Sequence, residues 1–120
     1  MDAYLKTTTN GSGTATEDYD SSVKGWLVAL DYEPGTFDTG ATITISDVTP
    51  TATHTIYVKA SAGTSNVRKY PRTLEQLDTD GSDLATYTFP LLVGVPRLTV
   101  ASGGDTKTGA VRLHILPWDN

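Results

Sequence analysis

Short runs of alternating apolar and polar residues recur along the chain, and most are bounded by Gly, Pro, Asn or Asp. Thr and Ser are abundant beside Val, Ile, Tyr and Trp, and β-branched and aromatic residues favour extended backbone. Apolar side chains at every second position lie on one face of a strand, and the residues that bound the runs form turns. No long helical repeat is evident. The pattern predicts an all-β fold with little or no helix.

Five segments show this pattern most clearly. Residues 25–32 form the first expected core strand. Residues 41–48 and 54–60 are predicted to pair as a hairpin across the Pro-containing turn between them. Residues 97–101 and 111–115 are predicted to form a second antiparallel hairpin, joined by a Gly-rich turn. In the last four segments the apolar residues face one way and largely polar residues face the other.

Such hairpins have one dry sheet face, which a second layer of strands must cover. Strands that recur every 8–12 residues or so, with turns between them, are typical of a sandwich. We therefore predict an antiparallel β-sandwich with jelly-roll-like connections. A register error of one residue would turn its core side chains outward. The core expected from the alternation comprises Trp26, Val28, Leu30, Ile43, Ile45, Ile56, Val58, Leu98, Val100, Val111, Leu113 and Ile115.

The length of 120 residues fits one domain. We expect residues 17–120 to form that domain. Residues 1–16 are interpreted either as an edge strand or as a flexible arm that adds to a neighbouring sheet. A further strand through residues 86–95 is expected to be kinked near Pro90. One short helical turn fits residues 74–77.

Composition excludes several classes of function. The formal net charge is −5 at pH 7, and this acidic balance argues against binding to duplex nucleic acid or to an anionic membrane. The chain has no cysteine, which removes thiol catalysis, iron–sulfur clusters and cysteine-bound zinc. No apolar run approaches the ~20 residues of a membrane-spanning helix, and the N-terminus lacks the features of a secretory signal. We expect synthesis and assembly in a cytoplasm.

The sharpest enzymatic motif is the segment 38–41, Asp-Thr-Gly-Ala. It resembles the active-site motif of retroviral-type aspartic peptidases, in which two chains each supply one Asp to a shared proton. Residues 92–94 resemble the segment that supports this loop in that family. Residues 33–37 do not form the buried apolar strand that should precede the motif, and a turn explains Asp38 equally well. We therefore predict no peptidase activity and no enzyme.

An acidic loop contains Asp78, Asp80 and Asp83 around a glycine. Carboxylates at such spacing can surround a hard cation, but the distal bidentate Glu of an EF-hand is missing. Asp-rich turns are also formed by side chains that hydrogen-bond their own backbone. We predict no tight calcium site here.

The histidines and the small basic group give weaker signals. His54 and His114 lie at outward positions of apolar strands, and two histidines without cysteine make a poor zinc site. Arg68, Lys69 and Arg72 stand out in an acidic chain, and a phosphate, an acidic partner or an internal ion pair would each explain them. We predict no catalytic or metal-binding residue and no cofactor.

A resemblance to a known group of proteins rests on several short motifs. Residues 97–109 are similar to the C-terminal R-[LVI]-x-[VI]-x-x-G-G-x-x-x-x-G hairpin of small tailed-bacteriophage proteins encoded among the virion structural genes. Residues 70–72 look like the Tyr-Pro-Arg step of that family, and residues 80–81 lie in its following acidic loop. Residues 23–32 and 37–45 look like its first two core strands.

The resemblance implies a virion structural protein without catalytic residues. A capsid decoration or cement protein is the expected role, with the major capsid protein and further copies of the chain as partners and no direct contact with nucleic acid or membrane. A neck or tail component is the nearest alternative. The expected location is the virion, assembled in the host cytoplasm.

A carbohydrate-binding sandwich is a further alternative, in which exposed Trp26, Tyr57 or Trp118 would form a stacking platform. The alternation in the first core strand predicts that Trp26 is buried, which would leave Trp118, near the C-terminus, as the remaining tryptophan.

Overall fold

The computed structural model describes residues 1–76 and 83–118, and the side chains of residues 1–73 and 87–118. Within these residues the chain forms strands and turns, with no helix. The helical turn expected at residues 74–77 is wrong for its described part, because the backbone there pairs as a strand. The strands are β1 (Asp2–Thr8), β2 (Ala15–Asp18), β3 (Val23–Glu33), β4 (Thr42–Val48), β5 (Thr53–Lys59), β6 (Val67–Lys69), β7 (Thr73–Gln76), β8 (Asp83–Thr88), β9 (Leu91–Ala101) and β10 (Thr108–Pro117).

Eight of these strands form one open antiparallel sheet in the order β1-β10-β3-β9-β4-β5, with β2 beside β9 and β6 beside β3. Strands β7 and β8 pair separately as a small hairpin. The predicted all-β antiparallel fold is therefore confirmed, while its jelly-roll connectivity stays a prediction. In the described part of the chain no helix has the length and apolar character needed to cross a membrane.

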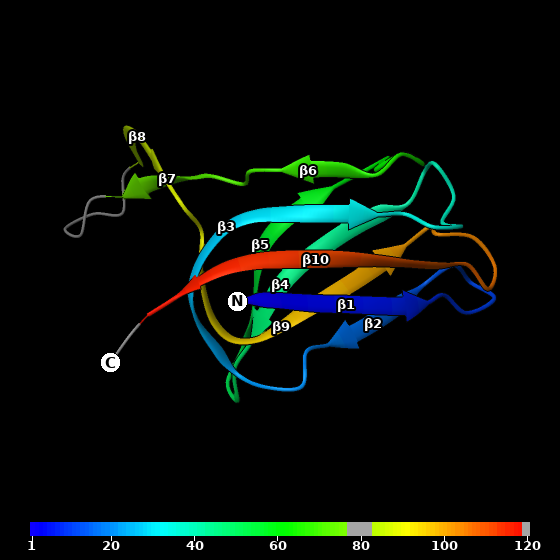
Figure 1. Cartoon of the computed structure of the whole chain (residues 1–120), viewed down its shortest axis with the longest axis horizontal. Coiled ribbons are helices and arrows are strands. Elements are labelled where there is room, and N and C mark those ends of the chain that lie inside the picture. The colour runs from blue at the N-terminus through cyan, green and yellow to red at the C-terminus, as the bar shows by residue number, and fades with distance from the viewer. Residues whose placement is uncertain (77–82, 119–120) are drawn as a thin grey trace.

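Strand β9 joins the two halves of the sheet. Its first residues, up to Gly94, pair with β3, and the rest pairs with β4. Gly94 has a φ of +127°, and a Cβ there would lie 2.5 Å from the carbonyl oxygen of Val48. Only glycine fits this backbone conformation and close approach. The strands β1, β10 and β3 consequently cross over β9, β4 and β5, with the core between the two layers (Figure 1).

The core draws on both layers, and most of the residues predicted from the alternation belong to it. Strands β1, β3 and β10 contribute from one side, and β4 and β9 contribute from the other. The correctly predicted buried residues are Leu30, Ile43, Ile45, Leu98, Val100, Val111, Leu113 and Ile115.

A β-bulge in β3 changes which residues reach the core. His114 of β10 lies opposite Ala29 but Ile115 lies opposite Leu27, so Val28 is skipped in the register. Leu27 is fully buried, whereas Trp26 and Val28 are half-buried on the outer face. The prediction that Trp26 and Val28 belong to the core is wrong, because the extra residue inverts the inward and outward positions on one side of the bulge.

A second bulge has the same effect in β5. Ile45 of β4 pairs with Tyr57 and the next residue pairs with Thr55, so Ile56 is skipped. Tyr57 and Ile56 pack against the core, whereas Val58 is 54% exposed. The core position predicted for Val58 is therefore wrong, and the inward residue at this level is Tyr57.

The two expected hairpins have different outcomes. Strands β4 and β5 pair with each other as predicted. Strands β9 and β10 do not pair: β10 lies between β1 and β3, and β9 lies between β3 and β4. The hairpin predicted for residues 97–115 is wrong, because the turn between these strands carries the chain from one layer to the other. The strand expected through residues 86–95 is divided between β8 and β9.

The N-terminal segment is an edge strand of the protein's own sheet. Strand β1 pairs with β10 from Asp2 opposite His114 to Thr8 opposite Thr108. Ala3 and Leu5 are buried, which anchors the strand on the core. Within residues 1–16, the part from Asp2 to Thr8 thus has the edge-strand conformation.

Candidate functional site

The outer face of β10, β3 and the start of β9 carries apolar side chains that are turned away from the core. Trp26 of β3 lies opposite Leu116 of β10 on one side and opposite Leu91 of β9 on the other. The next outward position of β3, Lys24, lies opposite Val93. Antiparallel pairing therefore places Leu91, Trp26 and Leu116 in a row across three strands.

Trp118 extends this row beyond the end of β10. Its backbone N–H donates to the carbonyl oxygen of Lys24 at 3.1 Å, which holds the residue beside β3. Its ring lies edge to face with Trp26, with 5.9 Å between the ring centroids and 62° between the planes. The Lys24 ammonium lies 5.9 Å from the Trp118 ring centre, within the range of a cation–π contact.

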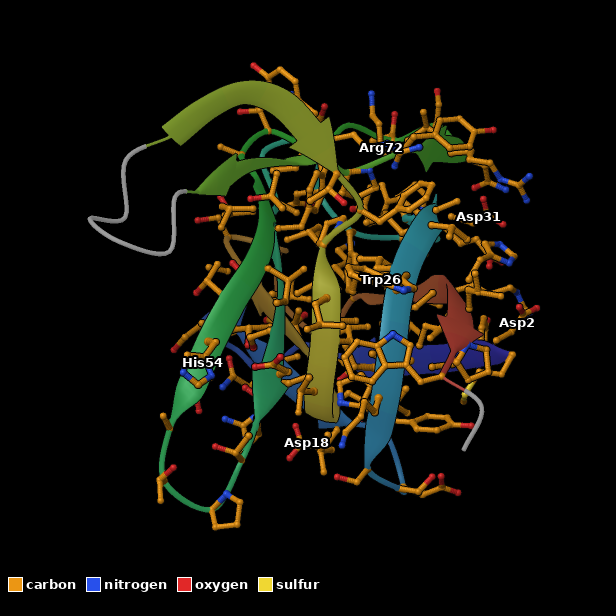
Figure 2. All side chains as sticks on the ribbon, turned by 90° about the vertical axis from the view of Figure 1, so that its left-hand side faces the viewer. Asp2, Asp18, Trp26, Asp31, His54 and Arg72 are labelled. Atoms are coloured by element: carbon orange, nitrogen blue, oxygen red, sulfur yellow. The ribbon has the colours of Figure 1, made fainter. Side chains whose placement is uncertain are left out.

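We call these residues, Trp26, Leu91, Val93, Leu116 and Trp118, the outer apolar patch. Leu116 is 58% exposed, Trp118 is 43% exposed and Val93 is 37% exposed. Figure 2 shows Trp26 on β3, with Asp31 further along the same strand. Contiguous apolar surface of this kind marks interaction sites, and tryptophan is enriched among the residues that dominate interface energies. The patch is the main candidate for a binding surface.

The other end of the outer face carries a chain of polar contacts that we call the charge ladder. Asp31 accepts two hydrogen bonds from Arg68, from Nε at 2.6 Å and from the terminal nitrogen at 3.0 Å. The His114 ring lies between two carboxylates, with Nε2 2.8 Å from Asp31 and Nδ1 3.1 Å from Asp2. These four residues belong to β1, β10, β3 and β6.

Hydrogen bonds with Arg68 and then with His114 hold the pKa of Asp31 well below its usual range. The hydrogen bond with Asp31 also raises the pKa of Arg68. The ladder is thus a set of mutually satisfied charges that links four strands.

The basic group noticed in the sequence is divided among three environments. Arg68 belongs to the charge ladder. Arg72 donates to the carbonyl oxygen of Pro71 at 2.6 Å and lies over the ring of Phe89, 4.3 Å from its centre. Lys69 lies opposite Leu30 and lines a cavity described below. The three side chains therefore do not form one phosphate site.

The two histidines lie in different layers and contact different carboxylates. His54 lies 3.2 Å from the carboxylate of Asp47, whose other oxygen accepts from the backbone N–H of Val93 at 3.0 Å. His114 belongs to the charge ladder on the opposite layer. Among the described residues, no group of three or more His, Cys, Asp and Glu could hold a metal ion.

Asp38 lies in an exposed turn. Its backbone N–H donates to the carbonyl oxygen of Gly103 at 3.0 Å, and its carboxylate lies beside Gly104. Residues 92–94 lie at the opposite end of β9 from this loop. The structure therefore does not bring together the segments on which the resemblance to a peptidase rests. Of the acidic loop, Asp78, Asp80 and the side chain of Asp83 lie outside the described residues.

Comparison with known proteins adds no relative, since no protein family, no curated protein sequence and no solved structure matches the chain.

Sequence reasoning missed the outer apolar patch because it expected Trp26 in the core. A signal for the patch was present in residues 26–30, which are all apolar. A strand with one wet face alternates, so an uninterrupted apolar run indicates apolar side chains on both faces. Residues 115–118 show the same feature beside it.

Proposed function

We propose that this chain is a non-enzymatic structural protein of a bacteriophage virion, a capsid decoration or cement protein that binds the major capsid protein and further copies of itself. The observation that carries the proposal is the outer apolar patch, where two tryptophans and three aliphatic residues meet water on one face of the sheet. The short motifs shared with small tailed-phage proteins supply the virion context. The jelly-roll-like connectivity expected of such a protein belongs to the same proposal.

The patch has the composition of the centre of a protein interface. Trp26 and Trp118 provide large, rigid contact surfaces, and Lys24 lies at the rim. Interfaces of this kind combine an apolar centre with a polar border that fixes orientation. The charge ladder provides such a border on the same face. A partner that covers the patch gains about 25 cal/mol for each Å² of apolar surface removed from water.

Two other functions use the same residues differently. A neck or tail component would bind through the same patch at another station of the particle. A carbohydrate would stack on one indole face, and the 62° between Trp26 and Trp118 leaves no flat double platform for it. A protein partner, which can fill the angle between the rings, fits the patch better.

The test is co-sedimentation with particles of the phage that encodes the chain, produced without this gene. Wild-type protein should bind these particles saturably, and the double variant Leu116→Asp/Trp118→Asp should bind at least about tenfold more weakly, because each change places a carboxylate in an apolar contact. Val58→Asp is the matched control, since Val58 is equally exposed but lies on the edge strand β5. It should bind like the wild type.

Failure of the wild-type protein to bind mature particles would contradict the proposal. Binding to purified tails but not to capsids would show that the protein is a tail component and not a capsid decoration protein. Normal binding by the double variant would show that another surface docks.

A further inference from the structure

A cavity of about 250 Å³ opens on the inner side of the sheet, between the edge strand β5 and the short strand β6. It is distinct from the outer apolar patch, with which it shares no residue. Side chains of β3, β4, β5 and β6 line it, together with the connection from β5 to β6. The apolar and aromatic lining residues are Leu30, Tyr32, Ile43, Tyr57, Ala62 and Val67.

The sheet topology explains why the core is open here. Strand β6 is three residues long and pairs with β3 only from Leu30 to Tyr32. Strand β5 is the last strand of the sheet path, and it pairs with β4 but not with β6. Within the described residues no strand pairing therefore joins β5 to β6, which lie in different layers of the fold (Figure 1).

Two lysines stand at inward positions of the strands that flank the cavity. Lys59 lies opposite Ile43 and Lys69 lies opposite Leu30, and both of these partners are buried core residues. Directly paired residues share a face of the sheet, so both ammonium groups belong to the cavity side. Neither lysine forms an ion pair with a carboxylate among the described residues. Two cations in a chain of net charge −5 thus face one apolar cavity.

Tyr32 adds an unused polar group. The residue is 3% exposed, and its hydroxyl is the one fully buried side-chain polar atom of the described residues without a hydrogen-bond partner. Burial raises the pKa of Tyr32, so the side chain stays a neutral phenol that can donate. A buried polar group without a partner is destabilising, so this hydroxyl lowers the stability of the apolar wall beside the cavity.

We propose that this cavity binds a small amphipathic carboxylate, with its apolar chain against the partly exposed Tyr57, Ala62 and Val67 and its carboxylate held by Lys59 and Lys69. Both ammonium groups donate, and an ionised carboxylate only accepts, so the charges and hydrogen bonds are complementary. At about 30 Å³ for each water-sized group, the cavity of about 250 Å³ holds roughly eight such groups. Octanoate has eight carbon atoms in its chain and carries the carboxylate at one end, so it is used as the probe.

The experiment is a titration of isotope-labelled protein with octanoate, followed by backbone amide chemical shifts. We expect the largest shift changes at residues 57–67, and binding about tenfold weaker for octan-1-ol, which has the same chain length but no charge. Octylamine should not bind, because its ammonium would be placed beside Lys59 and Lys69. These outcomes do not depend on particle binding, so this proposal and the proposed virion function fail separately.

Two variants sharpen the test. Lys59→Gln/Lys69→Gln should weaken octanoate binding at least about tenfold, whereas Lys6→Gln/Lys107→Gln, with the same change of net charge elsewhere, should not. Tyr32→Phe should raise the melting temperature of the free protein by a few degrees, because the unsatisfied hydroxyl is gone. Octanoate binding by this variant should match that of the wild type, because the hydroxyl is not accessible from the cavity.

No shift changes at the cavity in millimolar octanoate would overturn the proposal. The lysines would then be inward-pointing charges that only prevent edge-to-edge pairing of β5 and β6 with other sheets. Equal binding of octanoate and octan-1-ol would likewise reject the role of the lysines.

Discussion

The two ends of the outer face use the same strands in opposite ways. At the charge ladder, Asp31 and His114 each have polar partners on both sides. At the outer apolar patch, Trp26 and Trp118 meet edge to face and leave apolar surface in water. A satisfied set of charges gains little from a new partner, whereas exposed apolar surface gains from any surface that covers it. The comparison identifies the patch end as the end available for binding.

The bulge at Val28 separates these two ends. On one side of it Trp26 is directed outward and Leu27 inward, and on the other side Leu30 is inward and Asp31 outward. A bulge redirects the side chains that follow without breaking the strand. One strand can therefore supply an apolar outer face near its start and a charged outer face near its end.

The largest expected effect tests the assignment of inner and outer residues beside the bulge. Leu27→Ala should lower the free energy of unfolding by about 3 kcal/mol, because it leaves a cavity at a fully buried position. Trp26→Ala should cost clearly less, since its ring lies on the outer face. Urea denaturation measures both values. A larger loss for Trp26→Ala would mean that the tryptophan is a core residue and the patch is misassigned.

The second prediction breaks the charge ladder at its centre. Asp31→Asn removes the carboxylate that accepts from Arg68 and contacts His114, and should lower the free energy of unfolding by about 1 kcal/mol. Asp2→Asn is the control, because Asp2 is half exposed and contacts His114 over a longer distance. Its effect on the urea midpoint should be smaller. Equal changes of the urea midpoint in the two variants would show that Asp31 contributes no more than Asp2 to the stability of the charge ladder.

The third prediction concerns pH. The pKa of Asp31 is lowered in the folded state, so its contribution to stability is complete above the unfolded value of about 3.9 and is lost as the pH falls through the folded value. The difference in urea midpoint between wild type and Asp31→Asn should therefore have its full size at pH 5 and above, and should narrow below about pH 4. A difference that widens in acid would contradict the sign of the shift.

The smallest expected effect is at the apolar end. Trp118→Ala should change the free energy of unfolding by about 0.5 kcal/mol, because the residue is exposed and its main contact is the edge of Trp26. The fluorescence of Trp26 should change in the same variant, since its neighbouring ring is removed. A cost comparable to that of Leu27→Ala would show that the patch serves the fold and is not free to bind.

Much of the fold could be predicted because strand patterning is local. The alternation around Ile43 and Ile45, around Leu98 and Val100, and around Leu113 indicated strands with the correct inward residues. The turn between β4 and β5 also predicted the pairing that the structure has. These features depend on residues close in sequence, whose side chains alternate between two faces.

The positions of the bulges and the choice of neighbouring strands depend on the tertiary structure and not on local patterning. A bulge moves Trp26 outward because Leu27 fits the core on that side, and no period-two count marks the skipped residue. The choice of β1 and β3 as neighbours of β10, in place of β9, depends on packing between layers. The charge ladder and the cavity between β5 and β6 follow from those pairings. By itself the sequence determined the class of fold and most inward positions, whereas the binding surfaces arise only where strands distant in sequence meet.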